Sequence, residues 1–221
     1  MALDFAFLLD FRWVLLKGLW TTLQFVTLAL VIGLVWGFVL SLFRTSSNWV
    51  IYSLSTIYVE FFRGTPVLIQ LFWIFFCLPL FLDVNLSDFT SVVIALSLYS
   101  GAITSESFRA ALKSIESSQH DACIALGLPP TVRTLFVILP QAVLRAIPNL
   151  LSNVVSLFKE SALVSAVGMA DLMYVGQNIA NNVARPVEIL TAVALIYFAI
   201  GFPLTRAVSF VEARLLKVVK A

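Results

Sequence analysis

Charged residues are scarce in this chain. Asp, Glu, Lys and Arg together make up 12% of its 221 residues, and hydrophobic residues make up 61%, whereas soluble domains carry about 25% charged residues. The mean hydropathy of +1.01 agrees with this bias. The composition therefore excludes an ordinary soluble domain and predicts a membrane protein that crosses the bilayer several times.

Residues that carry catalysis or bind metals are also few. Cys77 and Cys123 are too few, and too different in their surroundings, for a disulfide framework or a metal site. The single histidine, His120, has no paired aspartates or Ser/Lys couple at a matching depth, which argues against an intramembrane enzyme. The chain has no Gly-x-x-x-x-Gly-Lys-Ser/Thr loop, so it is not itself an ATPase. We expect no metal and no cofactor bound by this chain.

The sequence also lacks internal repeats, low-complexity tracts and a separate soluble domain, so we expect one domain over residues 1–221. Secondary transporters usually show repeats with broken helices in matching positions. This chain has one candidate broken span and no counterpart to it, which makes a stand-alone secondary transporter or channel the less favoured alternative. Residues 1–13 lack a basic stretch and a cleavage site and are expected to form an interfacial amphipathic segment that is retained.

Five apolar stretches reach the length of about 20 residues that a spanning helix needs. They cover roughly residues 19–43, 51–81, 89–111, 135–158 and 187–210. The second is longer than a bilayer requires, so we expect tilt or a break at Gly64, Thr65 and Pro66. Glu60 and Arg63 lie three residues apart, and we favour an ion pair that braces this break over direct contact with a substrate.

Basic residues predict the orientation. With the polar segment after the third span placed in the cytoplasm, the inside holds Arg44, Arg109, Lys113, Arg133, Arg206, Arg214, Lys217 and Lys220, and the outside holds Arg12, Lys17 and Arg185. This excess of positive charge inside predicts an external N-terminus and a cytoplasmic C-terminus. The segment from residue 161 to residue 187 then forms a short helix and loop on the outer face, with a turn and a helix start at Gly168 to Asp171.

The segment between Ser105 and Gln141 is polar and is expected to contact a protein partner. Its central part, residues 112–134, is named here the coupling insert. Ser117 and Ser118 offer an N-cap for a helix from Gln119 to Leu126, which Gly127 would end. Small residues would let this helix enter a groove of another protein. Local physics supports equally a helix that rests on the membrane surface.

Two spans carry polar faces. On the fourth, these residues recur at helical spacing: Asn149, Asn153, Ser156 and Glu160. On the third, Ser97, Ser100 and Thr104 do the same. The faces suit a small zwitterion whose ammonium group contacts Glu160, and they suit equally the hydrogen bonds that join helices in membranes. Lys159, at the end of the fourth span, is expected to extend its side chain toward the membrane surface.

Three blocks of sequence resemble one transporter family. Asp121-Ala122-Cys123, followed by Gly127 and by Ile138-Leu139-Pro140, resembles the EAA loop of permease subunits of binding-protein-dependent ABC importers. The stretch FFRGTPVLIQ over residues 61–70 is similar to the FRGTP segment of the polar amino acid permeases, and SLFKESALVS over residues 156–165 is similar to their SLLKDTSL element. The chain departs from the pattern at Asp121 and Cys123, where glutamate and alanine are usual, and before Glu106, where Gly101 to Thr104 replaces alanine-tyrosine.

The resemblance implies an all-α membrane fold of the type I importer permeases, with five spans and a cytoplasmic coupling helix. It assigns contact with the ATPase to these residues: Asp121, Ala122, Cys123, Ala125, Leu126 and Gly127. It further implies a second permease subunit, identical or similar, a pair of ATPase subunits that bind ATP and Mg, and a periplasmic or extracellular solute-binding protein. The expected function is import of polar amino acids, or of close derivatives, from the binding protein across a bacterial inner membrane into the cytoplasm, and no nucleic acid is expected as a partner.

Overall fold

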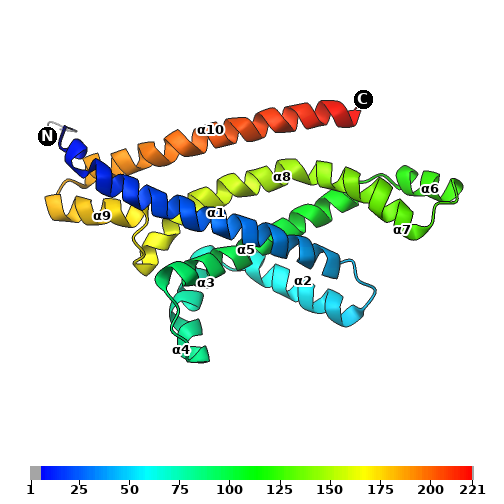
Figure 1. Ribbon diagram of the computed structural model, residues 1–221, viewed down its shortest axis with the longest axis horizontal. Coiled ribbons are helices and arrows are strands. Elements are labelled where there is room, and N and C mark those ends of the chain that lie inside the picture. The colour runs from blue at the N-terminus through cyan, green and yellow to red at the C-terminus, as the bar shows by residue number, and fades with distance from the viewer. Residues whose placement is uncertain (1–5, 221) are drawn as a thin grey trace.

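The computed structural model describes residues 6–220, and every regular element in this range is helical (Figure 1). In chain order the elements are η1 (Ala6–Phe11), α1 (Arg12–Phe43), α2 (Trp49–Gly64), α3 (Val67–Phe72), η2 (Trp73–Cys77), α4 (Leu78–Leu82), α5 (Asp88–Lys113), α6 (Ser117–Ala125), α7 (Pro130–Val132), η3 (Arg133–Ile138), α8 (Leu139–Glu160), η4 (Ser161–Val167), α9 (Leu172–Val183) and α10 (Pro186–Lys220). The expected all-α fold is confirmed. Part of the expected N-terminal interfacial segment, residues 1–5, lies outside the described residues.

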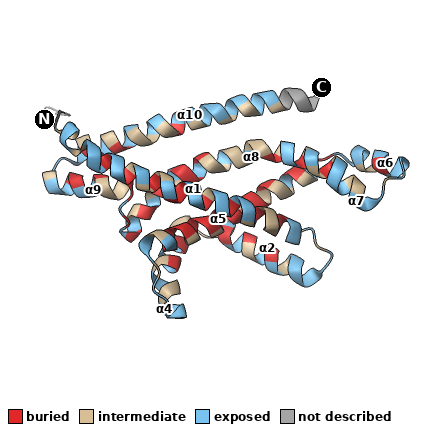
Figure 2. Ribbon diagram, in the orientation of Figure 1, coloured by how far each residue is buried: buried red, intermediate tan, exposed pale blue. Residues whose placement is uncertain are grey.

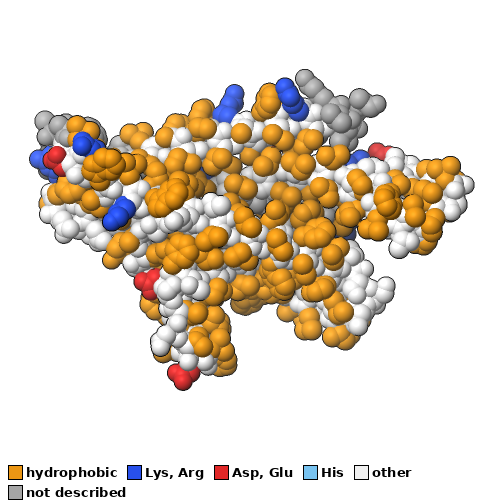
Figure 3. Space-filling model, viewed as in Figure 1, with side chains coloured by type: hydrophobic (Ala, Val, Ile, Leu, Met, Phe, Trp, Pro, Cys, Tyr) orange, Lys and Arg blue, Asp and Glu red, His pale blue; other side chains and the backbone are white. Residues whose placement is uncertain are grey.

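Four of these helical stretches are long and apolar enough to cross a membrane, and the bent pair of α2 with the segment Val67–Leu82 provides a fifth. The expected number of spans is therefore reached when the bent pair counts as one. Apolar side chains cover most of the visible face, and most of the few charged side chains lie along its edges (Figure 3). The helix that contains the first expected span begins at Arg12, and the last one, α10, continues to Lys220.

The second span is broken, and the direction of the chain changes by 109° between its two parts. Pro66 follows the end of α2, and Thr65 before it is extended, with φ −110° and ψ 145°, as is usual for the residue that precedes a proline. The side-chain amide of Gln70 bridges the break. It donates hydrogen bonds to the carbonyl oxygen of Phe62 at 2.8 Å and to that of Thr65 at 3.0 Å. The break predicted at Gly64, Thr65 and Pro66 is confirmed.

Helices α1 and α5 pack closely because glycine lies at their crossing. A Cβ atom at Gly33 would lie 2.7 Å from the Cβ atom of Ser100, and one at Gly37 would lie 2.6 Å from the carbonyl oxygen of Gly101. Buried residues are concentrated where the two helices run side by side (Figure 2). Two glycines four residues apart form the small-residue motif that lets helix backbones approach in membranes.

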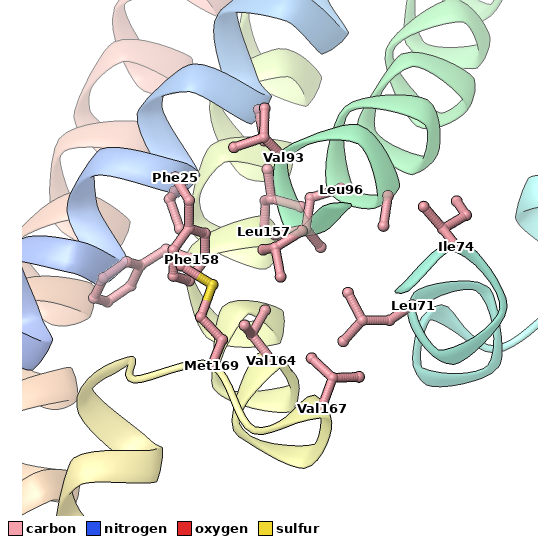
Figure 4. Close-up of a cluster of buried hydrophobic side chains, with 14 residues drawn as sticks. Phe25, Leu71, Ile74, Val93, Leu96, Leu157, Phe158, Val164, Val167 and Met169 are labelled. Atoms are coloured by element: carbon pink, nitrogen blue, oxygen red, sulfur yellow. The ribbon is translucent and has the colours of Figure 1, made fainter. Parts of the chain in front are cut away.

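The largest apolar core lies beside this crossing and joins several elements (Figure 4). Its labelled members are Phe25 of α1, Leu71 of α3, Ile74 of η2, Val93 and Leu96 of α5, Leu157 and Phe158 of α8, Val164 and Val167 of η4, and Met169. The core ties the bent span and the end of α8 to the α1 and α5 pair. The relative positions of α5 and α8, which carry the polar faces, follow from this packing.

The segment after α8 has the turn and helix start that the sequence predicts. Gly168 adopts φ +86°, in the left-handed region, and Asp171 caps α9 by accepting a hydrogen bond from the backbone N–H of Tyr174 at 2.8 Å. Asp171 is fully buried, and the hydroxyl of the equally buried Thr22 accepts a hydrogen bond from the backbone N–H of Leu172 at 3.1 Å. The segment is thus fixed to α1.

We predict that Gly37→Ala destabilises the protein. The added methyl group would lie 2.5 Å from the Cβ atom of Thr104, and overpacking of this kind costs about 1–3 kcal/mol. The midpoint of thermal unfolding in detergent should fall. Gly201→Ala is the matched control, because its Cβ atom would meet only Phe158, at 4.0 Å. Equal midpoints for the two variants would contradict the close α1–α5 crossing.

Candidate functional site

The coupling insert lies at one end of the molecule, where α6 is beside α7 and α7 continues through η3 into α8 (Figure 1). A small apolar cluster at its base contains Ile115, Ile138 and Ala142. Two polar contacts add to it: the Arg145 guanidinium donates to the carbonyl oxygen of Ser114, and the Gln141 amide donates to the Gln119 side chain at 3.2 Å. The insert is therefore attached both to the end of α5 and to the start of α8.

The two faces of α6 differ in exposure. Cys123 is buried, with 4% of its surface exposed, whereas Ile124 is 60% and Leu126 is 76% exposed. Of the six residues assigned to ATPase contact, five are exposed: Asp121, Ala122, Ala125, Leu126 and Gly127. Cys123 faces the chain itself. The exposed surface of α6 is mixed. Ala122, Ile124 and Ala125 form a small and apolar part that a groove could accept, and Ser117, Ser118, Gln119 and Asp121 are polar.

The ends of α6 differ partly from the prediction. The helix begins at Ser117, so Ser117 and Ser118 lie inside it, and the N-cap is Glu116, which makes no side-chain cap hydrogen bond. The expected serine N-cap is therefore wrong; the Ser118 hydroxyl donates instead to the Glu116 carboxylate at 3.1 Å. At the other end, Gly127 adopts φ +66° as expected. Its N–H donates to the carbonyl oxygen of Ile124 at 2.9 Å, and the next N–H, of Leu128, donates to that of Cys123 at 3.0 Å, the pair of bonds of a Schellman motif.

A polar hollow of about 120 Å³ lies between α5 and α8. Its lining residues are Tyr99, Ser100, Ile103, Asn153, Ser156, Leu157 and Glu160. The Tyr99 hydroxyl donates a hydrogen bond to Oε1 of Glu160 at 3.1 Å. The other carboxylate oxygen, Oε2, is buried without a hydrogen-bond partner among the described residues. Glu160 thus lines the hollow with one carboxylate oxygen bonded to Tyr99 and the other buried and unpaired among the described residues.

A second hollow, of about 300 Å³, adjoins the first, and Ser100 and Asn153 line both. Thr104 also lines it, together with apolar residues of α1 and α8. The Asn153 amide donates to the hydroxyl of Ser107 at 3.0 Å, a residue of α5. The polar faces of α5 and α8 therefore meet, and one of their contacts is a hydrogen bond between helices.

The structure brings together five of the seven predicted pathway residues: Ser100, Thr104, Asn153, Ser156 and Glu160. Ser97 is buried and lines neither hollow, and Asn149 is exposed away from both. Tyr99 was missed because an aromatic residue in an apolar helix carries no polar signal until its hydroxyl finds a partner. Lys159, beside Glu160, is exposed at the end of α8.

Five charged side chains form ion pairs that join α1, α2 and α5. We call this group the arginine cluster, and its members are Arg44, Glu60, Arg63, Glu106 and Arg109. The predicted pair of Arg63 with Glu60 is present at 3.5 Å. Glu106 accepts from Arg44 at 2.9 Å and from Nε of Arg109 at 2.8 Å, and it lies 3.5 Å from Arg63. The Arg44 side chain is only 6% exposed.

The arginine cluster holds the two charged side chains at the start of the polar segment. Glu106 and Arg109 open the segment that was expected to contact a partner protein, but the structure directs both side chains to the arginine cluster. Arg44 and Glu106 were missed as a pair. The available signal was that a carboxylate in a candidate span needs a cation nearby, but the partner is 62 residues away in sequence.

Comparisons with known proteins agree with this architecture. A family model described as "Binding-protein-dependent transport system inner membrane component" matches residues 8–217. The probable amino-acid ABC transporter permease protein PatM of Vibrio harveyi is 37% identical over 219 residues, which cover 98% of each chain. The arginine transport system permease protein ArtQ of Bacillus subtilis is 34% identical over 215 residues, covering 97% of this chain and 98% of the relative.

Two solved structures of ABC transporters have a fold similar to that of this chain. The crystal structure of an amino acid ABC transporter with histidines superimposes with a TM-score of 0.92 at 32% identity, covering 97% of this chain and 100% of that chain. The inward-facing MetNI methionine ABC transporter superimposes with a TM-score of 0.70 at 22% identity, over 91% and 98% of the two chains, and supports the fold alone.

Proposed function

Because the chain belongs to the family of binding-protein-dependent transport system inner membrane components, we propose that it is the membrane-spanning subunit of an ATP-driven importer of amino acids. The observation that carries the proposal is the arrangement on α5. One part of this helix lines the polar hollow with Tyr99 and Ser100, and its end leads directly into the coupling insert. A movement of the insert can therefore displace the lining of the hollow through a single continuous helix.

The ATPase is a separate partner in this proposal. ATP and Mg bind to a pair of ABC ATPase subunits, and the outer face of α6 docks on one of them through residues such as Ala122 and Leu126. Closure of the ATPase pair moves the helices as rigid bodies and opens the pathway to alternate sides. A second permease subunit, identical or similar, completes the pathway, and a solute-binding protein delivers the substrate from outside.

The orientation follows from the same partners. An ATPase works in the cytoplasm, so the coupling insert and the C-terminal end of α10 lie inside, and the N-terminus and α9 lie outside. The positive-inside rule supports this direction, because Arg206 and Arg214 lie on the inner part of α10. Segment 161–187 then covers the outer end of the pathway.

The substrate class follows from the polar hollow. Glu160 offers a carboxylate whose Oε2 atom lacks a partner among the described residues, and this group suits the ammonium group of an amino acid. The amide of Asn153 and the hydroxyl of Ser156 can donate to the carboxylate of the same molecule. An acidic group in an apolar span is costly, and a cationic substrate group would offset that cost.

Reconstitution tests the function. We expect uptake of labelled amino acids into proteoliposomes only when this chain, its ATPase, its binding protein and ATP are all present. Gly127→Asp should abolish uptake and reduce co-purification of the ATPase, because it places a charge on the docking turn. Gly168→Asp is the matched control for ATPase co-purification, which it should leave unchanged: both glycines have positive φ, and a Cβ atom added at either would meet no other atom within 4 Å. Uptake without the ATPase would indicate a secondary transporter instead.

The substrate site has its own test. We predict that Glu160→Gln raises the KM for uptake about tenfold, which corresponds to about 1.4 kcal/mol, because the ammonium group loses its counter-charge. Glu212→Gln, the same change at an exposed position of α10, should leave KM unaltered. Unchanged KM and maximal rate in Glu160→Gln would assign Glu160 to helix packing with Tyr99.

A further inference from the structure

Arg63 occupies an unusual place, between two carboxylates on different helices. One of its terminal nitrogens, Nη1, lies 3.5 Å from Oε1 of Glu60, on its own helix α2, and 3.5 Å from Oε2 of Glu106, on α5. The Arg63 side chain is 36% exposed. It can therefore shift between the two partners without leaving a buried charge unpaired.

The other arginines of the cluster behave differently. Arg44 is 6% exposed; it contacts Glu106 at 2.9 Å and lies 3.7 Å from Glu60, so it attaches the end of α1 to both α5 and α2. Arg109 bonds to Glu106 within the same helix, three residues along. Within the arginine cluster, Arg63 is the residue that joins α2 to α5 directly.

On the α5 side, the pair connects to the coupling insert. Helix α5 continues from Glu106 to Lys113, and α6 begins at Ser117. The insert is attached to this end of α5 by the Arg145 contact to Ser114 and by the cluster at Ile115. Movement of the insert is therefore passed to Glu106 through a continuous helix.

On the α2 side, the pair lies at the break in the second span. Arg63 directly precedes Gly64, where a Cβ atom would have open space within 4 Å. Beyond it, the Gln70 amide connects the two parts of the broken span. A displacement of Arg63 therefore acts on the 109° bend itself.

We propose that the Arg63–Glu106 ion pair transmits movement of the coupling insert to the broken second span, which makes Arg63 a positioning residue for transport. The inference rests on the proposed function. It extends that function by giving the bent span a part in the transport cycle and by naming a contact through which ATP-driven movement reaches it, beside the hydrogen bond from the Tyr58 hydroxyl to the carbonyl oxygen of Leu98.

The test compares Arg63→Gln with Arg109→Gln in the complete complex of permease, ATPase and binding protein. Each variant removes one arginine from Glu106, but only the first removes the direct ion pair between α2 and α5. The indirect connection through Arg44, which lies 3.7 Å from Glu60 and 2.9 Å from Glu106, is kept in both variants. Arg63→Gln is expected to fold, because Glu106 keeps Arg44 and Arg109. The readout is substrate transported per ATP hydrolysed, which a merely structural defect would not change selectively.

We expect Arg63→Gln to lower the amount of substrate transported per ATP about tenfold, while its rate of ATP hydrolysis stays within about twofold of the unmodified complex. Single mutations are known to change the coupling between two sites of a protein by about this much. Arg109→Gln should keep the ratio, and Arg63→Lys, which retains the charge, should restore most of it. Should Arg63→Gln not assemble, Arg63→Met and Arg109→Met provide the same comparison. Equal losses in the two variants, or uptake and hydrolysis that fall in proportion, would overturn the proposal. Absence of ATP-dependent uptake by the unmodified complex would instead reject the proposed function.

Discussion

The close approach of α1 and α5 is the constraint on which the other features depend. Glycine at positions 33 and 37 leaves no room for a side chain between the two backbones. In a bilayer, where apolar side chains gain little by leaving lipid, such packing is a main source of helix association. It fixes α5 in the centre of the fold, and α5 carries the polar hollow, Glu106 and the base of the coupling insert.

Charge placement follows from the same low-dielectric environment. An isolated charge in a span is costly, so charged groups are retained where partners or function offset the cost. The arginine cluster meets this requirement through ion pairs between three helices. Glu160 meets it only in part, because Tyr99 binds one of its oxygens and the other has no partner in the described chain.

Sequence periodicity predicted the features that depend on local residues. The break at Pro66, the turn at Gly127 and the polar faces of α5 and α8 each follow from residues within a few positions of one another. The rotation of each helix against its neighbours does not, because it is set by contacts such as Gly37 with Gly101. For this reason periodicity could not show that Ser97 and Asn149 line neither hollow. Periodicity likewise could not predict that Cys123 faces the chain itself or that Glu106 pairs with Arg44, because both depend on how separate helices pack.

The central claim is that the coupling insert controls access to the polar hollow through α5. The most direct measurement is the reactivity of a cysteine at Ser156, an exposed lining residue, toward a membrane-impermeant thiol reagent in the assembled complex, with Cys77 replaced by serine. The account predicts that ATP changes this reactivity severalfold and that the change disappears when Gly127→Asp is added. The account would be contradicted if the reactivity were the same with and without ATP, or if the effect of ATP were still present in the Gly127→Asp variant.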